Sequence, residues 1–251
     1  MHNFELSRFP STPDDTYLSR VQSINNQDGS RSLYKASRFM VSNEKLVIVD
    51  FLKQLKVNPH PHLLIPEAFN GTLDQSLVEF YPLIEDPIMG NEELTIKEGI
   101  KAGKLCENDL VDMMVQLTSA VSYIHNLGYV HGDIRTQNIF IKADGDSLSL
   151  TLFDYNSLRK PYYQTKGIDS WNLEKPPELL TGNVMVDSRF DVYALGYILF
   201  NLTHEFNASQ PISPLNPNHP IFDVIRKAKA LLTDCYADAI QMHNDLMTID
   251  S

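Results

Sequence analysis

Cysteine is scarce in this sequence, and so are the segments that would direct it to a membrane. Cys106 and Cys235 are its two cysteines, too few for a disulfide framework or a cysteine metal site, and they indicate a reducing compartment. The first residues, MHNFELSRFPSTPDD, lack the basic-then-apolar order of a secretory signal. The longest apolar run, Val192–Leu202, has 11 residues and is interrupted by Asn201, far short of a membrane span. We therefore expect a cytoplasmic protein without a transmembrane segment.

Positive charge is also in short supply. The chain has 21 lysine and arginine residues against 32 aspartate and glutamate residues, a formal net charge of −11. A protein that binds nucleic acid or an anionic membrane needs a basic face, so this balance argues against both classes. Hydrophobic residues make up 43% of the 251 residues, which is enough for a sizeable core in one compact unit or two small lobes.

Residues 129–156, YVHGDIRTQNIFIKADGDSLSLTLFDYN, hold the polar residues with the clearest chemical meaning. Two apolar runs, Asn138–Lys142 and Leu148–Phe153, flank the sequence Ala-Asp-Gly-Asp-Ser, which is typical of a hairpin turn. A hairpin brings Asp154 back toward the loop that holds Asp133 and Asn138. Carboxylate and amide oxygens are the hard ligands that Mg²⁺ prefers. The pattern therefore predicts that these three residues converge on a divalent ion.

The same stretch resembles the catalytic core of the eukaryotic protein kinase family. The family's H-R-D-x-K-x-x-N reads as HGDIRTQN over His131–Asn138, and its D-F-G reads as DYN over Asp154–Asn156. The step of five residues from aspartate to asparagine is preserved. This agreement of several residues at family spacing is far more specific than any one of them alone.

The resemblance implies a role for each matching residue. Asp133 is expected to accept the proton of the substrate hydroxyl, and Asn138 and Asp154 to hold the metal. Arg135 is expected to steady the transferring phosphate, and its position two residues after Asp133 matches the lysine of serine/threonine kinases. ATP and Mg²⁺ are the implied cofactors, and a protein is the implied substrate or partner.

The family also implies an α+β fold with two lobes. We expect a small β-rich lobe with one main helix over residues 1–84 and a larger, mostly helical lobe over residues 85–251. Helical spacing of apolar residues predicts the main helix at Ser42–Lys56. Two further helices are expected late in the chain, at Ile221–Cys235 and Tyr236–Met247.

The nucleotide-binding residues of the small lobe are expected from the same resemblance. Lys35, in Ser-Leu-Tyr-Lys, matches the lysine of the family's V-A-I-K, which binds the nucleotide phosphates. Two acids are available to pair with it from the main helix. Glu44 is preferred for its reach, although an acid in a first helical turn also simply complements the helix dipole, and Asp50 is the other choice.

Three features depart from the family pattern. The connection expected to cover the phosphates, Pro10–Asp15, contains no glycine, two prolines and two aspartates, so it offers few N–H donors and repels anions. Gly132 replaces the arginine that grips a phosphorylated activation loop in the family. The late arginine that pairs in the family with the glutamate of A-P-E, here Glu178, should fall near Gln241 or His243, and neither is an arginine.

Three functions follow from these observations. The leading interpretation is an ATP- and Mg²⁺-dependent serine/threonine protein kinase with an atypical, glycine-free nucleotide loop. The alternative is a pseudokinase that acts as a protein-binding scaffold or allosteric partner, which the departures favour. A third interpretation keeps the fold but transfers another group from ATP, such as a nucleotidyl group, or uses a non-protein acceptor.

Overall fold

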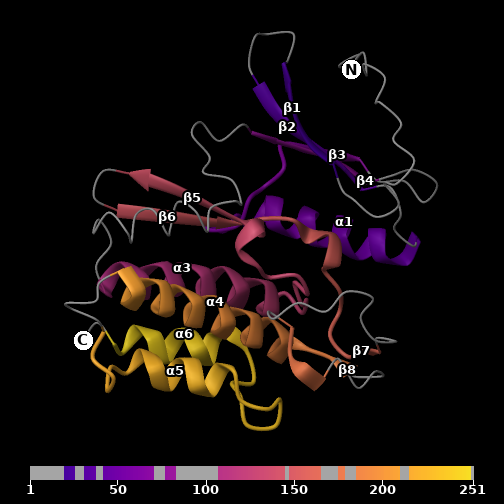
Figure 1. The fold of residues 1–251 in the computed structure, drawn as a ribbon. Coiled ribbons are helices and arrows are strands. Elements are labelled where there is room, and N and C mark those ends of the chain that lie inside the picture. Colours follow the sequence, from indigo (N-terminus) through magenta and orange to yellow (C-terminus); the bar gives the residue numbers. More distant parts are fainter. Residues whose placement is uncertain are drawn as a thin grey trace, which may run out of the picture.

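The computed structural model describes nine stretches of the chain, shown in Figure 1 as helices, strands and the segments between them. They are residues 20–25, 31–37, 42–70, 77–82, 107–144, 147–164, 175–178, 185–209 and 215–249. The glycine-free connection at residues 10–15 lies outside these stretches.

A four-stranded antiparallel sheet lies at one end of the molecule (Figure 1). Its strands follow the order β1-β2-β4-β3. They are β1 (Arg20–Asn25), β2 (Arg31–Ser37), β3 (Ala68–Asn70) and β4 (Leu77–Pro82). The register places Lys35 at the middle of β2, opposite Val21 on β1 and Glu79 on β4. The candidate lysine is therefore on a strand with a neighbour on each side.

Helix α1 (Ser42–Val57) follows the sheet strands β1 and β2, and its position agrees with the sequence prediction. Ile48, Phe51, Leu52 and Leu55 are fully buried, at the spacing that puts residues on one face of a helix. This face packs into the main hydrophobic core, together with residues of α3 and of the segment 139–152.

The predicted hairpin is confirmed. Strands β5 (Ile139–Asp144) and β6 (Ser147–Leu152) pair antiparallel, with Ile139 opposite Leu152. Helix α3 (Glu107–Asn126) lies beside the hairpin and fixes it through one side chain: Gln116 donates to Leu148 O at 2.7 Å and accepts from Leu150 N at 2.8 Å. The part of the hairpin nearer its turn is thus anchored to α3, whereas the open end is held by the backbone of residues 62–64, through Leu64 N to Leu152 O and Leu152 N to His62 O, both at 2.9 Å.

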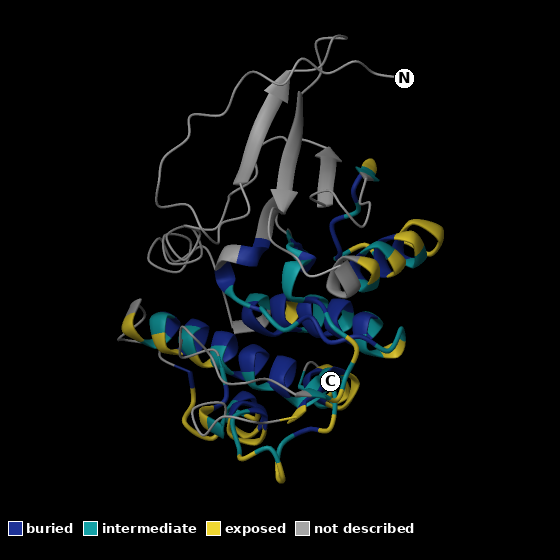
Figure 2. Cartoon of the chain, turned by 90° about the vertical axis from the view of Figure 1, so that its right-hand side faces the viewer, coloured by how far each residue is buried: buried dark blue, intermediate teal, exposed yellow. Residues whose placement is uncertain are grey.

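The rest of the described chain is mostly helical. It contains α4 (Ser188–Ser209), α5 (Ile221–Ala228) and α6 (Ala239–Met247), with the short strands β7 (Tyr163–Gln164) and β8 (Met185–Val186) at one end. Figure 2 shows that buried residues run along the inner sides of these helices and of α3, with exposed residues on the outer sides. None of the described helices combines the length and the apolar character needed to cross a membrane.

One helix prediction is wrong. The helix expected over Ile221–Cys235 ends at Ala228, and a turn follows in which Asp234 N and Cys235 N both donate to Leu231 O, at 2.8 and 3.0 Å. The helix expected from Tyr236 begins at Ala239 instead, because the side chain of Asp238 caps it by accepting from Gln241 N at 3.2 Å. The turn therefore separates α5 from α6.

Candidate active site

Asp191, in the first turn of α4, holds the loop that precedes the hairpin, at His131 and Gly132. Its carboxylate accepts from His131 N at 2.7 Å and from Gly132 N at 2.9 Å, and all but 1% of the residue is buried. A buried carboxylate that accepts two backbone N–H groups orients the peptide planes on both sides of His131.

Two histidines complete this support. His131 is fully buried; its Nδ1 accepts from Asp133 N at 3.3 Å, so Nε2 carries the proton and faces Phe153 O at 3.3 Å. His125 accepts from Ala239 N through Nδ1 at 3.2 Å and donates through Nε2 to Asp191 at 3.0 Å. Both rings use both nitrogens for hydrogen bonds within the protein, to backbone groups and to Asp191, so neither is placed to act as a general base.

Asp133 and Asn138 contact each other directly. The Asn138 amide donates to Asp133 O at 2.7 Å and to Asp133 Oδ2 at 3.0 Å. The short helix η1 (Thr136–Asn138) makes this contact possible, because its turn brings Asn138 N to 2.9 Å from Arg135 O. Asp133 keeps its Oδ1, and Asn138 its amide oxygen, without a hydrogen bond to any described residue. Both oxygens remain available to a ligand.

Arg135 lies beside the same carboxylate. Its Nε is 3.5 Å from Asp133 Oδ2, close enough for an ion pair, and makes no hydrogen bond within the described part of the chain although it is buried. The hydroxyl of Thr136, the next residue, is also buried and also makes no hydrogen bond to a described residue. Buried donors without an acceptor are rare in folded proteins. The Arg135 side chain as a whole is 40% exposed, so its guanidinium can meet an anion beside Asp133 although Nε itself is buried.

Asp154 lies where the chain leaves the hairpin. Phe153 N donates to Asn138 O at 2.9 Å, which extends the strand pairing to the residue before Asp154. Asp154 itself has a left-handed backbone, φ 66° and ψ 78°, and its side chain accepts from Asn156 N at 3.2 Å as the cap of η2 (Tyr155–Ser157). A left-handed conformation is uncommon outside glycine and is found at functional turns. The hairpin thus places the backbone of Asp154 next to that of Asn138, which agrees with the position predicted from the sequence.

The donor set fits a divalent ion with a bound phosphate. Carboxylate and amide oxygens of Asp154 and Asn138 are hard ligands, and Mg²⁺ takes its remaining ligands from water and phosphate. Within the described residues no group of three or more His, Cys, Asp or Glu side chains could hold a metal by itself. A site here would therefore depend on the amide of Asn138 and on the nucleotide, in addition to carboxylates.

Tyr155 connects this site to α1. Its ring is fully buried between Phe51 and His131, with ring centroids 5.0 and 5.9 Å away, and its hydroxyl donates to Leu64 O at 2.9 Å. Aromatic contacts at these separations are favourable beyond the buried area alone. The position of α1 is thereby coupled to the loop that holds Asp133.

Tyr129 makes a second connection to α1. Its hydroxyl donates to Asp50 Oδ2 at 2.5 Å and accepts from Gln54 Nε2 at 2.9 Å. Burial, followed by the hydrogen bond to Asp50, raises the pKa of Tyr129 far above its usual value. Asp50, one of the two acids considered for Lys35, is thus bound to Tyr129, two residues before the start of the segment His131–Asn138. The side chains of Lys35 and Glu44 lie outside what the structure describes, although their backbones are on β2 and in the first turn of α1.

The backbone conformation at position 132 and the space around it account for a glycine there. Its φ is +77°, and a Cβ added there would lie 2.8 Å from Ser157 O. In the sequence, Gly132 stands where the family has an arginine. The structure adds that no side chain fits the position, because the neighbouring backbone after Asp154 occupies the space.

Comparisons with known proteins agree with this site. A model of the protein kinase domain family matches residues 48–245, most of the chain, and the chain belongs to that family. Cyclin-dependent kinase 12 of Caenorhabditis elegans is 24% identical over 231 residues, 82% of this chain and 30% of its own length.

Two other relatives are also kinases by name. The serine/threonine-protein kinase GL21140 of Drosophila persimilis is 33% identical over 118 residues, 45% of this chain and 15% of its own. The maternal embryonic leucine zipper kinase of Xenopus tropicalis is 25% identical over 193 residues, 69% of this chain and 28% of its own. The chain therefore spans less than a third of the length of each of these three relatives. Membership of the family implies the two-lobed kinase fold.

Proposed function

We propose that this chain is an ATP- and Mg²⁺-dependent serine/threonine protein kinase, which transfers the γ-phosphate to a hydroxyl group of a protein. The observation that carries the proposal is the contact of Asn138 with Asp133 at the open end of a hairpin whose other strand leads to Asp154. The serine/threonine class is supported by the position of Arg135, two residues after Asp133, and by the names of the relatives.

Each residue has a defined part in this proposal. Asp133 orients the acceptor hydroxyl and takes its proton on the oxygen that Asn138 does not use. Arg135 donates to the phosphate being transferred, through the guanidinium that lies beside Asp133. Asn138 and Asp154 hold Mg²⁺, which when bound neutralises the charge of the phosphates. Catalysis of this kind depends mainly on positioning and charge, so a few well-placed groups suffice.

The small lobe supplies the rest of the nucleotide site. We propose that residues 1–84 form this lobe and residues 85–251 the larger one, with ATP between them. Lys35 on β2 binds the phosphates, and Glu44 in the first turn of α1 orients Lys35. Asp50 is the weaker candidate for the second role, since its carboxylate already accepts from Tyr129.

Radiolabelled ATP tests the proposal and separates its alternatives. The chain is incubated with Mg²⁺ and a dephosphorylated casein acceptor, using ATP labelled at either the γ- or the α-phosphate. We expect transfer from the γ-position that is abolished by Asp154→Ala and by Asp133→Asn. Label from the α-position would indicate nucleotidyl transfer. No transfer of either label, with no ATP-dependent thermal shift at millimolar nucleotide, would indicate a scaffold protein instead.

A further inference from the structure

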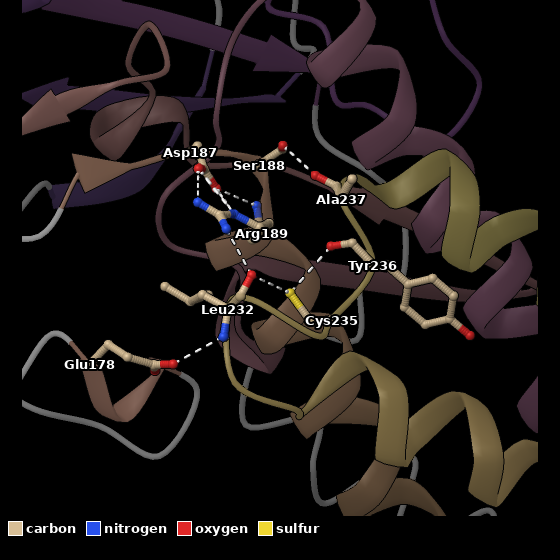
Figure 3. A network of polar contacts seen from close by, with 8 residues as sticks. All are labelled: Glu178, Asp187, Ser188, Arg189, Leu232, Cys235, Tyr236 and Ala237. Atoms are coloured by element: carbon tan, nitrogen blue, oxygen red, sulfur yellow. Dashed lines mark hydrogen bonds and ion pairs between the residues drawn. The ribbon is translucent and has the colours of Figure 1, made fainter.

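Glu178 and Arg189 meet at one residue, Leu232, in the turn between α5 and α6. Leu232 N donates to Glu178 Oε1 at 3.0 Å, and Leu232 O accepts from Arg189 Nη1 at 2.7 Å. Figure 3 shows the two side chains reaching the turn from different directions, Glu178 on one side and Arg189 on the other. The backbone of Leu232 is thus bound on both sides: its N–H donates to the carboxylate of Glu178, and its C=O accepts from the guanidinium of Arg189.

Arg189 is itself held rigidly. Its Nε lies 2.9 and 3.0 Å from the two oxygens of Asp187, and its Nη2 lies 2.5 Å from Asp187 Oδ2. The side chain of Asp187 is only 9% exposed and that of Arg189 34%. This hydrogen bonding with Asp187 raises the pKa of Arg189, so the guanidinium stays charged. A fork of this kind has a fixed direction, which leaves Nη1 aimed at the turn.

The side chain of Leu232 extends the connection toward the catalytic loop. It packs against a small buried cluster formed by Val130, Val186 and Phe190. Val130 directly precedes His131, and its backbone exchanges two hydrogen bonds with Arg159, at 2.8 and 3.0 Å. A shift of Leu232 would therefore displace Val130, and with it the loop that holds Asp133 and the segment that follows Asp154.

The two positions where a late arginine was expected have other contacts. Gln241 accepts from Ala237 N at 3.2 Å, within its own turn. His243 Nδ1 lies 3.0 Å from Thr118 Oγ1 and 3.2 Å from Val115 O, on helix α3. Gln241 is thus bonded to the residues just before α6 and His243 to α3, whereas Arg189 at the start of α4 reaches the turn that Glu178 also contacts.

We infer that Arg189 is a positioning residue: by holding Leu232, it keeps the segment Lys175–Glu178 in place, and with it the surface on which the acceptor protein binds. The functional part of this inference rests on the proposed kinase activity, because Glu178 ends the chain segment that begins at Asp154. The structural part does not, since Leu232 links Glu178 and Arg189 whether or not phosphate is transferred.

Amide hydrogen exchange tests the structural part. Arg189→Met keeps the aliphatic stem and removes the fork, and Arg189→Lys keeps the charge alone. The matched control is Arg226→Met, which removes an exposed ion pair with Asp223 (side chains 76% and 74% exposed). We expect exchange of the amides in residues 230–236 to rise at least tenfold in Arg189→Met, less in Arg189→Lys, and not at all in the control. Unchanged exchange in Arg189→Met would overturn the inference.

Glu178→Gln distinguishes a link through Leu232 from a direct attraction between two charges. Glutamine keeps an oxygen acceptor for Leu232 N but carries no charge. In double-mutant cycles with Arg189→Met, measured at the 230–236 amides, we expect a coupling energy near zero for Glu178→Gln and a clear one for Glu178→Ala. A coupling energy for Glu178→Gln as large as that for Glu178→Ala would mean that the charges interact directly, and the inference would be wrong.

Kinetics test the functional part. With casein as acceptor, Arg189→Met should raise the KM for casein about tenfold and change the KM for ATP less than twofold. A general loss of folded protein would instead lower kcat and leave both constants unchanged, and that result would contradict a positioning role. If the unmodified chain transfers no phosphate, the proposed function fails, while the exchange experiments still decide the link between Glu178 and Arg189.

Discussion

Replacing Gly132 by alanine should destabilise the protein through two separate effects. A φ of +77° costs a residue with a side chain about 1–2 kcal/mol relative to glycine. The new Cβ would also lie 2.8 Å from Ser157 O, an overpacked contact that typically costs about 1–3 kcal/mol. We therefore expect the free energy of unfolding to fall by about 2–5 kcal/mol, a large part of the ~5–15 kcal/mol typical of a whole protein.

The contact cannot be relieved cheaply, because both backbones are held. Gly132 N donates to Asp191 at 2.9 Å. On the other side, Ser157 ends η2, Leu158 N donates to Tyr155 O at 3.0 Å, and Arg159 pairs with Val130. Moving Ser157 O away would disturb the segment that starts at Asp154. Gly132→Arg, which restores the family's arginine, should therefore harm the protein at least as much as Gly132→Ala.

Gly128→Ala is the matched control. Gly128 has the same φ of +77°, but a Cβ there would meet nothing within 4 Å. It should cost about 1–2 kcal/mol, the conformational effect alone. The unfolding free energies of both variants are measured by urea denaturation, with tryptophan fluorescence or circular dichroism as the signal. Equal losses in the two variants would refute the argument that the space at Gly132 is occupied by the Ser157 carbonyl.

Two other predictions concern contacts around α1 and α3. Tyr129→Phe removes the hydroxyl that binds Asp50 and Gln54 and should lower the unfolding free energy by about 1 kcal/mol in urea, whereas no change would mean that solvent replaces these bonds fully. Burial, and then the charge of His62, lowers the pKa of His60 from 6.5 to about 4. The unfolded chain therefore binds a proton between those values that the folded chain does not, so stability should fall as the pH drops from 6.5 toward 4. His60→Gln should flatten that slope in pH-dependent melts; an unaltered slope would exclude His60 as its source.

Local signals predicted the elements around the site well. The turn sequence after Lys142 and the two apolar runs that flank it are sufficient for β5 and β6, because a hairpin is specified by neighbouring residues. Helix α1 was predicted to within a residue, since its buried face follows helical spacing. The association of Asp133 with Asn138 also follows from their separation of five residues across one turn of η1.

Long-range contacts account for what the sequence did not reveal. The helix predicted to reach Cys235 looks continuous, because Leu231 and Leu232 extend its apolar pattern, yet the backbone of Leu232 binds Glu178 and Arg189 instead. Nothing local marks Arg189 as their partner. The environment of Gly132 was hidden for a related reason: the sequence shows a glycine where the family has an arginine, but the carbonyl of Ser157 that limits the space there comes from a distant segment.

The account depends most on Asn138 and Asp154 sharing one divalent ion near Asp133. Isothermal titration of ATP with and without Mg²⁺ tests this directly, in the unmodified chain, Asp154→Ala and Asp133→Asn. We predict that Mg²⁺ strengthens ATP binding in the unmodified chain and in Asp133→Asn, and that Asp154→Ala removes this gain. A gain from Mg²⁺ that is as large in Asp154→Ala as in the unmodified chain would contradict the account.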